Sequence, residues 1–94
     1  MTRYTVVWNS DFEAQYTDAW TKSDSETREI LTELANWVDR ELVDDPVSKG
    51  RLSAEPLTYI AAVPNALARI SVAYQVLPDD RLVRVVRMTF KRDN

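Results

Sequence analysis

Apolar and polar residues alternate most regularly over residues 69–76, where nearly every second position is apolar. A period of two is typical of a β-strand with one buried face. Residues 82–90 are a second apolar run, and the turn-forming Pro-Asp-Asp at 78–80 separates the two runs, which together predict a β-hairpin. Residues 57–63 predict another strand before this hairpin.

The period changes in the first half of the chain. Residues 4–8 are β-branched and aromatic and predict a first strand. After it, Phe12, Tyr16 and Trp20 recur at the spacing of one helix face, which predicts a short amphipathic helix. A second helix is predicted from an apolar stripe that comprises Ile30, Leu31, Leu34, Trp37, Val38 and Leu42.

Local signals set the boundaries of these helices. Ser10 and Ser23 are each followed three residues later by Glu, the capping-box spacing, so both serines are predicted to be N-caps. The turn between the helices is short, which predicts an antiparallel αα-hairpin. Residues 47–56 contain the only glycine, Gly50, and are interpreted as a linker.

The predicted order is therefore β-α-α-β-β-β, within a single domain over residues 1–94. Helices followed by consecutive strands favour the α+β class. We expect the helical hairpin to pack on one face of a mostly antiparallel, four-stranded sheet.

Composition narrows the chemistry. The chain contains no Cys and no His, which excludes disulfides, argues against a structural zinc site and removes the usual proton-transfer residue near neutral pH. The carboxylates on the predicted helices lack the spacing of a metal site, so no cofactor or metal is expected; they are Glu29, Glu33, Asp39 and Glu41.

The longest apolar stretch is too short to span a bilayer, and no signal peptide is recognisable. We therefore expect a cytoplasmic protein.

Charge is distributed unevenly along the chain. Residues 1–46 carry four basic and eleven acidic side chains, a formal charge of −7, whereas residues 47–94 carry eight basic and four acidic ones, a charge of +4. Such asymmetry indicates a polyanionic partner, most often a nucleic acid. The basic half coincides with the predicted sheet and the acidic half with the predicted helices. We therefore expect phosphate to bind on the sheet.

Several segments resemble the RelE/ParE-like toxins of bacterial type II toxin–antitoxin modules, whose fold has the same order of elements. The matching segments are residues 4–8 (YTVVW), 42–46 (LVDDP), 72–81 (VAYQVLPDDR) and 85–88 (VVRM). The resemblance implies a plasmid-stabilisation type of toxin that is neutralised by a cognate antitoxin, an extended and largely helical protein.

In the ribonuclease branch of this family, basic residues cleave mRNA at the ribosome. By resemblance the chain would be a metal-independent mRNA interferase, and the cations before the second predicted strand match Lys49 and Arg51. The candidate catalytic residues are Lys49, Arg51, Arg69, Arg87 and Lys91. The candidate RNA-binding set adds Arg84 and Arg92.

Three features depart from the ribonuclease pattern. Ser71 stands where the family usually has an arginine, although Arg69 lies two residues earlier on the same strand face. Residues 89–91 read Thr-Phe-Lys where many members have Gly-His-Arg, and the C-terminal catalytic tyrosine has no matching residue. Two alternatives remain open: a ParE-like inhibitor that binds DNA gyrase without being an enzyme, and a toxin fold retained only for protein–protein binding.

The basic residues also have purely structural interpretations. Arg84 and Arg87 are equally consistent with a solvated strand face that discourages pairing with another chain. Lys91 and Arg92 are consistent with a frayed basic tail.

The aromatic residues also have either a structural or a functional interpretation. Tyr74 has the alternation of a buried position, so we expect it to pack in the core and not to act as a catalytic phenol. Trp20 and Trp37 are expected in the core as well. Trp8 and Tyr59 are candidates for partial exposure and base stacking.

Overall fold

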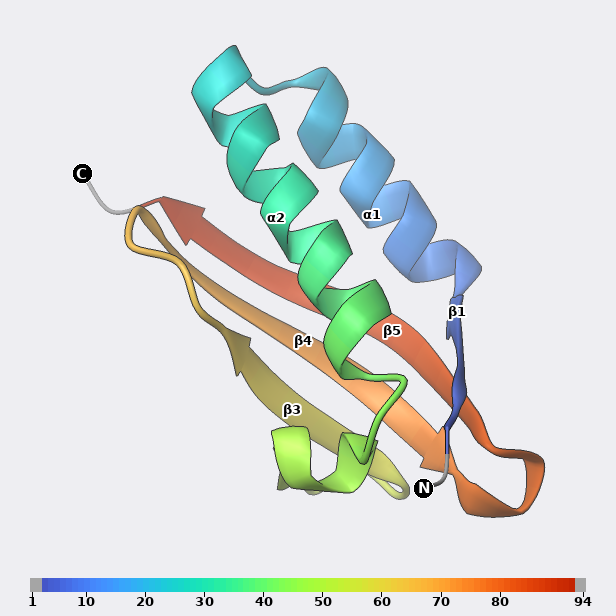
Figure 1. Ribbon diagram of the computed structural model, residues 1–94. Coiled ribbons are helices and arrows are strands. Elements are labelled where there is room, and N and C mark those ends of the chain that lie inside the picture. Colours follow the sequence, from blue (N-terminus) through green and yellow to red (C-terminus); the bar gives the residue numbers. More distant parts are fainter. Residues whose placement is uncertain (1–2, 93–94) are drawn as a thin grey trace.

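Two helices cover one face of a five-stranded sheet in the computed structural model, which describes residues 3–92 (Figure 1). Residues 1, 2, 93 and 94 of the predicted domain lie outside the described residues. In chain order the elements are β1 (Thr5–Trp8), α1 (Ser10–Thr21), α2 (Ser25–Glu41), the 3₁₀ helix η1 (Pro46–Lys49), β2 (Arg51–Leu52), β3 (Thr58–Val63), β4 (Ala68–Leu77), the 3₁₀ helix η2 (Pro78–Asp80) and β5 (Leu82–Arg92).

The strands lie in the order β1-β5-β4-β3-β2. β1 runs parallel to β5, and the other three pairings are antiparallel. The α+β class, the helical hairpin on one face and the mostly antiparallel sheet are thus confirmed. The predicted number of four strands was wrong, because Arg51 and Leu52 of the expected linker pair with Ile60 and Tyr59. A strand of two residues is too short to produce a visible alternation.

The predicted helix caps were wrong by one residue each. α1 begins at Ser10 and its N-cap is Asn9. α2 has Asp24 as its N-cap, and the Asp24 carboxylate accepts a hydrogen bond of 2.9 Å from the backbone N–H of Thr27. This bond is the main reason that the pKa of Asp24 is lowered. Ser23 instead donates its hydroxyl hydrogen bond to the carbonyl of Ala19.

The core lies between the helical hairpin and the sheet. α2 contributes most of the helical side, and α1 contributes Phe12. The buried residues that form this core are Phe12, Ile30, Leu31, Leu34, Val38, Leu42, Ala61, Val63, Ala68, Ile70, Val72, Tyr74, Val76, Val83, Val85 and Met88. Trp20 and Trp37, expected in the core, are only partly buried and pack against its outside.

Tyr74 connects the sheet with the segment that follows α2. Its side chain is completely buried, and its hydroxyl donates a 2.8 Å hydrogen bond to the carbonyl of Pro46 in η1. The ring stacks on Tyr59 with centroids 6.0 Å apart. Gly50 lies so close that a Cβ there would be 2.7 Å from the Tyr74 hydroxyl and 2.6 Å from the Ile60 carbonyl oxygen. The expectation that Tyr74 is a packed residue is confirmed.

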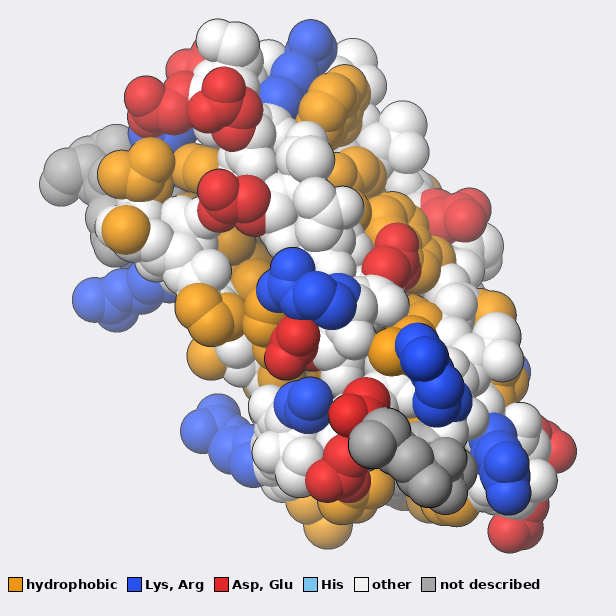
Figure 2. All heavy atoms as spheres, viewed as in Figure 1, with side chains coloured by type: hydrophobic (Ala, Val, Ile, Leu, Met, Phe, Trp, Pro, Cys, Tyr) orange, Lys and Arg blue, Asp and Glu red, His pale blue; other side chains and the backbone are white. Residues whose placement is uncertain are grey.

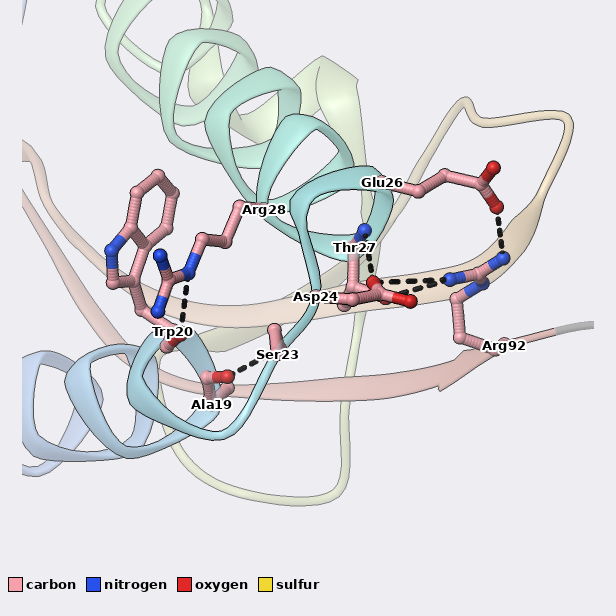
Figure 3. Close-up of polar contacts among 8 residues, drawn as sticks. All are labelled: Ala19, Trp20, Ser23, Asp24, Glu26, Thr27, Arg28 and Arg92. Carbon is pink, nitrogen blue, oxygen red and sulfur yellow. Dashed lines mark hydrogen bonds and ion pairs between the residues drawn. The ribbon is translucent and has the colours of Figure 1, made fainter.

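Arg92 joins the end of β5 to the start of α2 (Figure 3). Its guanidinium forms an ion pair with Glu26, donates a 2.6 Å hydrogen bond to the Thr27 hydroxyl and lies 4.0 Å from the carboxylate of Asp24. The same close-up shows the turn between the helices, where Arg28 donates a 3.0 Å hydrogen bond to the carbonyl of Trp20. The basic residue at the end of β5 is therefore held by the helices.

The Tyr74 contact leads to a stability prediction. Replacing Tyr74 with Phe leaves the Pro46 carbonyl buried without its donor, so we expect the free energy of unfolding to fall by about 1–2 kcal/mol in urea denaturation. The matched control is Tyr59→Phe, which removes the hydroxyl of the neighbouring, only partly buried ring that stacks on Tyr74. Equal stability of the two variants would contradict the role of Tyr74.

The same contact has a pH dependence. Burial, with a smaller contribution from Tyr59, raises the pKa of Tyr74 to about 12. An unfolded tyrosine ionises near pH ~10, so the stability contributed by the neutral hydroxyl is complete below about pH 10 and is lost as the pH rises towards 12. The Tyr74→Phe variant should lose less stability than the parent protein over this range.

Arg92 gives a second stability prediction. Arg92→Met removes the contacts to Glu26 and Thr27, and we expect it to lower the free energy of unfolding by roughly 0.5–1.5 kcal/mol. Arg40→Met is the matched control, because Arg40 pairs with Glu41 on the surface, where ion pairs contribute little. A loss no larger than that of the control would show that Arg92 does not stabilise the fold.

Candidate nucleic-acid interface

The sheet has a second face that the helices do not cover, which we call the open face. Its defining residues are the exposed cations Arg51 on β2, Arg69 on β4, and Arg84, Arg87 and Lys91 on β5. Side chains of directly paired strand residues lie on the same side of a sheet. One row runs from Arg51 through Ile60 and Ala73 to Arg87. Arg69 lies directly opposite Lys91.

A β-bulge brings Arg84 and Arg87 onto this same face. In a regular strand, residues three apart point to opposite faces. Between β4 and β5 the register shifts, because Ala73 pairs with Arg87 whereas Tyr74 pairs with Val85, which leaves Val86 as an extra residue on β5. The bulge therefore keeps Val85 and Met88 in the core while both arginines remain exposed.

Between the cations the open face carries mostly small or uncharged side chains. Ser71 of β4 lies between Ala62 of β3 and Thr89 of β5. Gln75 lies next to Arg84. These side chains leave the cations as the dominant chemical feature of the face.

Most of the acidic residues lie on the two helices, which cover the other face of the sheet. From Ser10 to Glu41 the helical hairpin carries nine acidic and three basic side chains. Figure 2 shows this side, with acidic side chains gathered near the start of α2; the open face is turned away from the viewer. The helical side is thus mostly acidic, although Figure 2 also shows Lys and Arg there, whereas the exposed cations named above lie on the open face.

A carboxylate also reaches the open face. Glu55, in the turn between β2 and β3, accepts hydrogen bonds of 2.5 and 3.4 Å from the two terminal nitrogens of Arg87. About half of each side chain remains exposed to solvent. Nothing in the sequence around Glu55 indicated this contact, because the two residues are 32 positions apart and Glu55 is in a turn.

Two cations of the predicted set are held elsewhere. Lys49, in η1, lies 3.6 Å from the carboxylate of Glu41 at the end of α2. Hydrogen bonding from Arg40, with the charge of Lys49 nearby, lowers the pKa of Glu41. Arg92 is held by the start of α2, as described above. The structure therefore brings five of the seven predicted RNA-binding residues to one face and places Lys49 and Arg92 against the helices.

The aromatic residues considered for base stacking lie on the helical side. Trp8 donates a 3.1 Å hydrogen bond from its indole nitrogen to Asp39 and contacts the ring of Phe12. Tyr59 stacks on Tyr74. Among residues 3–92, no aromatic side chain belongs to the open face, so this face offers charge without a stacking platform.

The chemistry of the open face is that of an electrostatic surface. Preorganised cations stabilise negative charge that develops in a transition state.

In the described part of the chain, no group of three or more His, Cys, Asp or Glu side chains is arranged to hold a metal ion. No helix among these residues is long and apolar enough to cross a membrane.

Known proteins are similar to this chain in structure, but none is detectably similar in sequence. No family model matches the chain, and no curated protein is detectably similar in sequence. Among solved structures, a chain of the toxin–antitoxin complex RelBE2 from Mycobacterium tuberculosis superposes with a TM-score of 0.71 at 17% identity, covering 99% of this chain and 97% of that one.

Two Escherichia coli structures are also similar. A chain of the intact RelBE toxin–antitoxin complex superposes with a TM-score of 0.59 at 18% identity, covering 97% of this chain and 98% of that one. The isolated RelE toxin gives a TM-score of 0.58 at 21% identity, with coverage of 97% and 86%. At this level of identity the likeness shows the fold alone. The chain has the fold of the RelE toxins.

Proposed function

We propose that this protein is the toxin of a type II toxin–antitoxin module and that it binds and cleaves mRNA at the ribosome through the open face. The observation that carries the proposal is the segregation of five exposed cations onto one face of a RelE-like fold. The helical hairpin on the other face, by contrast, carries nine acidic and three basic side chains between Ser10 and Glu41.

The open face suits a phosphate backbone. Lysine and arginine that neutralise phosphates release counterions, so affinity arises largely from charge and decreases as the salt concentration rises. Without aromatic platforms on the described part of this face, binding has little means of selecting a sequence by stacking. The ribosome would then supply the position of the message, which agrees with a ribosome-dependent reaction.

Cleavage of RNA by attack of the 2′-hydroxyl group places extra negative charge on the phosphorus oxygens. Arg69, Arg87 and Lys91, on adjacent strands, are the residues that we assign to this charge, with Arg51 and Arg84 holding neighbouring phosphates. With no His in the chain, proton transfer on this face falls to a lysine or a carboxylate, here Lys91 or Glu55.

We also propose a cognate antitoxin as the protein partner. Structures similar to this chain are described as RelBE toxin–antitoxin complexes and as a RelE toxin variant with an antitoxin RelB peptide. An antitoxin segment that orders on binding is able to cover a large surface of the toxin. The proposal places the toxin in the cytoplasm, where its ribosomal substrate is found.

The proposal predicts the effect of removing open-face charge. Purified protein added to a translating extract should fragment the message, and Arg84→Gln/Arg87→Gln should slow fragmentation about tenfold or more, because each cation contributes to phosphate binding or charge stabilisation. The measurement is gel analysis of a labelled message over time. The matched control is Lys22→Gln/Arg40→Gln, which removes two charges from the exposed surface of the helices.

Two results would contradict the proposal. An intact message at saturating protein would exclude the nuclease, and an equal effect of the two double variants would exclude the open face as the site. A DNA supercoiling assay run in parallel identifies the alternative, since loss of gyrase activity with an intact message is the outcome expected for a ParE-like inhibitor.

A further inference from the structure

The ion pair between Glu55 and Arg87 crosses the middle of the open face. Arg87 is on β5 and Glu55 lies in the turn after β2, so that β3 and β4 lie between their backbones. Ala73 is the β4 residue opposite Arg87, and it is only 5% exposed although its own side chain points to the open face. Its burial indicates that longer side chains from neighbouring strands lie across it.

The turn that carries Glu55 has a defined geometry. The Ser53 hydroxyl accepts a 3.1 Å hydrogen bond from the backbone N–H of Glu55, and the Glu55 carbonyl accepts a 3.3 Å bond from the N–H of Thr58. Leu57 has a left-handed backbone, with φ of 59°. Pro56 fixes the backbone that directly follows Glu55. The carboxylate is therefore presented to Arg87 by a constrained turn.

A carboxylate that meets both terminal nitrogens of an arginine uses the donors that a phosphate would use. Arginine binds carboxylate and phosphate groups with the same planar pair of N–H donors. As long as Glu55 occupies these donors, a phosphate that binds through the same pair of terminal nitrogens of Arg87 has to displace it. Because both side chains are about half exposed, the pair contributes little to folding and is able to open without disturbing the core.

We propose that Glu55 is an intramolecular mask for the Arg87 phosphate site, a carboxylate that lowers the affinity of the open face for RNA until a correctly placed phosphate displaces it. The inference rests on the proposed function for the identity of the polyanion, but the mask itself concerns only Glu55 and Arg87. As a consequence, free RNA binds weakly. The phosphate backbone of an RNA that is held in position at the open face displaces Glu55 from Arg87.

The test is a double-mutant cycle with a short fluorescein-labelled single-stranded RNA, measured by fluorescence anisotropy over a series of potassium chloride concentrations. Glu55→Gln should bind about threefold to tenfold more tightly than the parent protein, and the slope of log affinity against log salt should steepen by about 0.7, the contribution of one more phosphate contact. In an Arg87→Gln background the same Glu55→Gln change should produce almost no further gain.

The matched control is Glu29→Gln, which removes one negative charge from the exposed surface of α2 and should leave affinity nearly unchanged. An equal gain from Glu29→Gln, or an equal gain from Glu55→Gln with and without Arg87, would overturn the mask and leave only a general effect of net charge. If Glu55→Gln with Arg87 intact bound RNA no more tightly than the parent protein, the mask would be overturned as well.

Elution from a heparin column separates this inference from the proposed function. Heparin is a polyanion without bases or ribose, so later elution of Glu55→Gln that depends on Arg87 would support the mask even if RNA did not bind. If RNA failed to bind, the proposed function would fail while the mask stood. Identical elution of all four proteins in the cycle would overturn the mask independently of RNA.

Discussion

Burial of one face of β4 and β5 under the α1–α2 hairpin is the constraint on which the rest of the structure depends. The apolar stripe of α2, with Phe12 of α1, needs a matching apolar surface, and alternate strand residues provide it. The intervening residues are then forced to the opposite side, where no helix covers them. Charged side chains at those positions therefore do not destabilise the core.

The bulge at Val86 reconciles this constraint with the positions of the arginines. Without the extra residue, one of Arg84 and Arg87 would point into the core, where an unpaired charge is strongly unfavourable. With it, both stay on the open face while Val83, Val85 and Met88 remain buried. Glu55 then pairs with Arg87 across the open face.

The sequence predicted those features that depend on local periodicity. Alternation in β4 and the helical stripe of α2 indicated both the elements and their buried faces. The two-residue strand β2 lacked enough length for such a signal. The caps were misplaced because Asn9 and Asp24, next to the predicted serines, take that position. Charge alone located the candidate interface on the sheet. It did not separate Lys49 and Arg92 from the other cations, because their carboxylate partners come from the helices in tertiary contact.

The central claim is that the polyanion binds the open face of the sheet. The most direct measurement is a titration of isotopically labelled protein with short single-stranded RNA, followed by amide chemical shifts. The account predicts shifts concentrated along β4 and β5, at Arg69, Arg84, Arg87 and Lys91, with the outer surfaces of α1 and α2 unaffected. Shifts concentrated on the helices, with β4 and β5 unchanged, would contradict it.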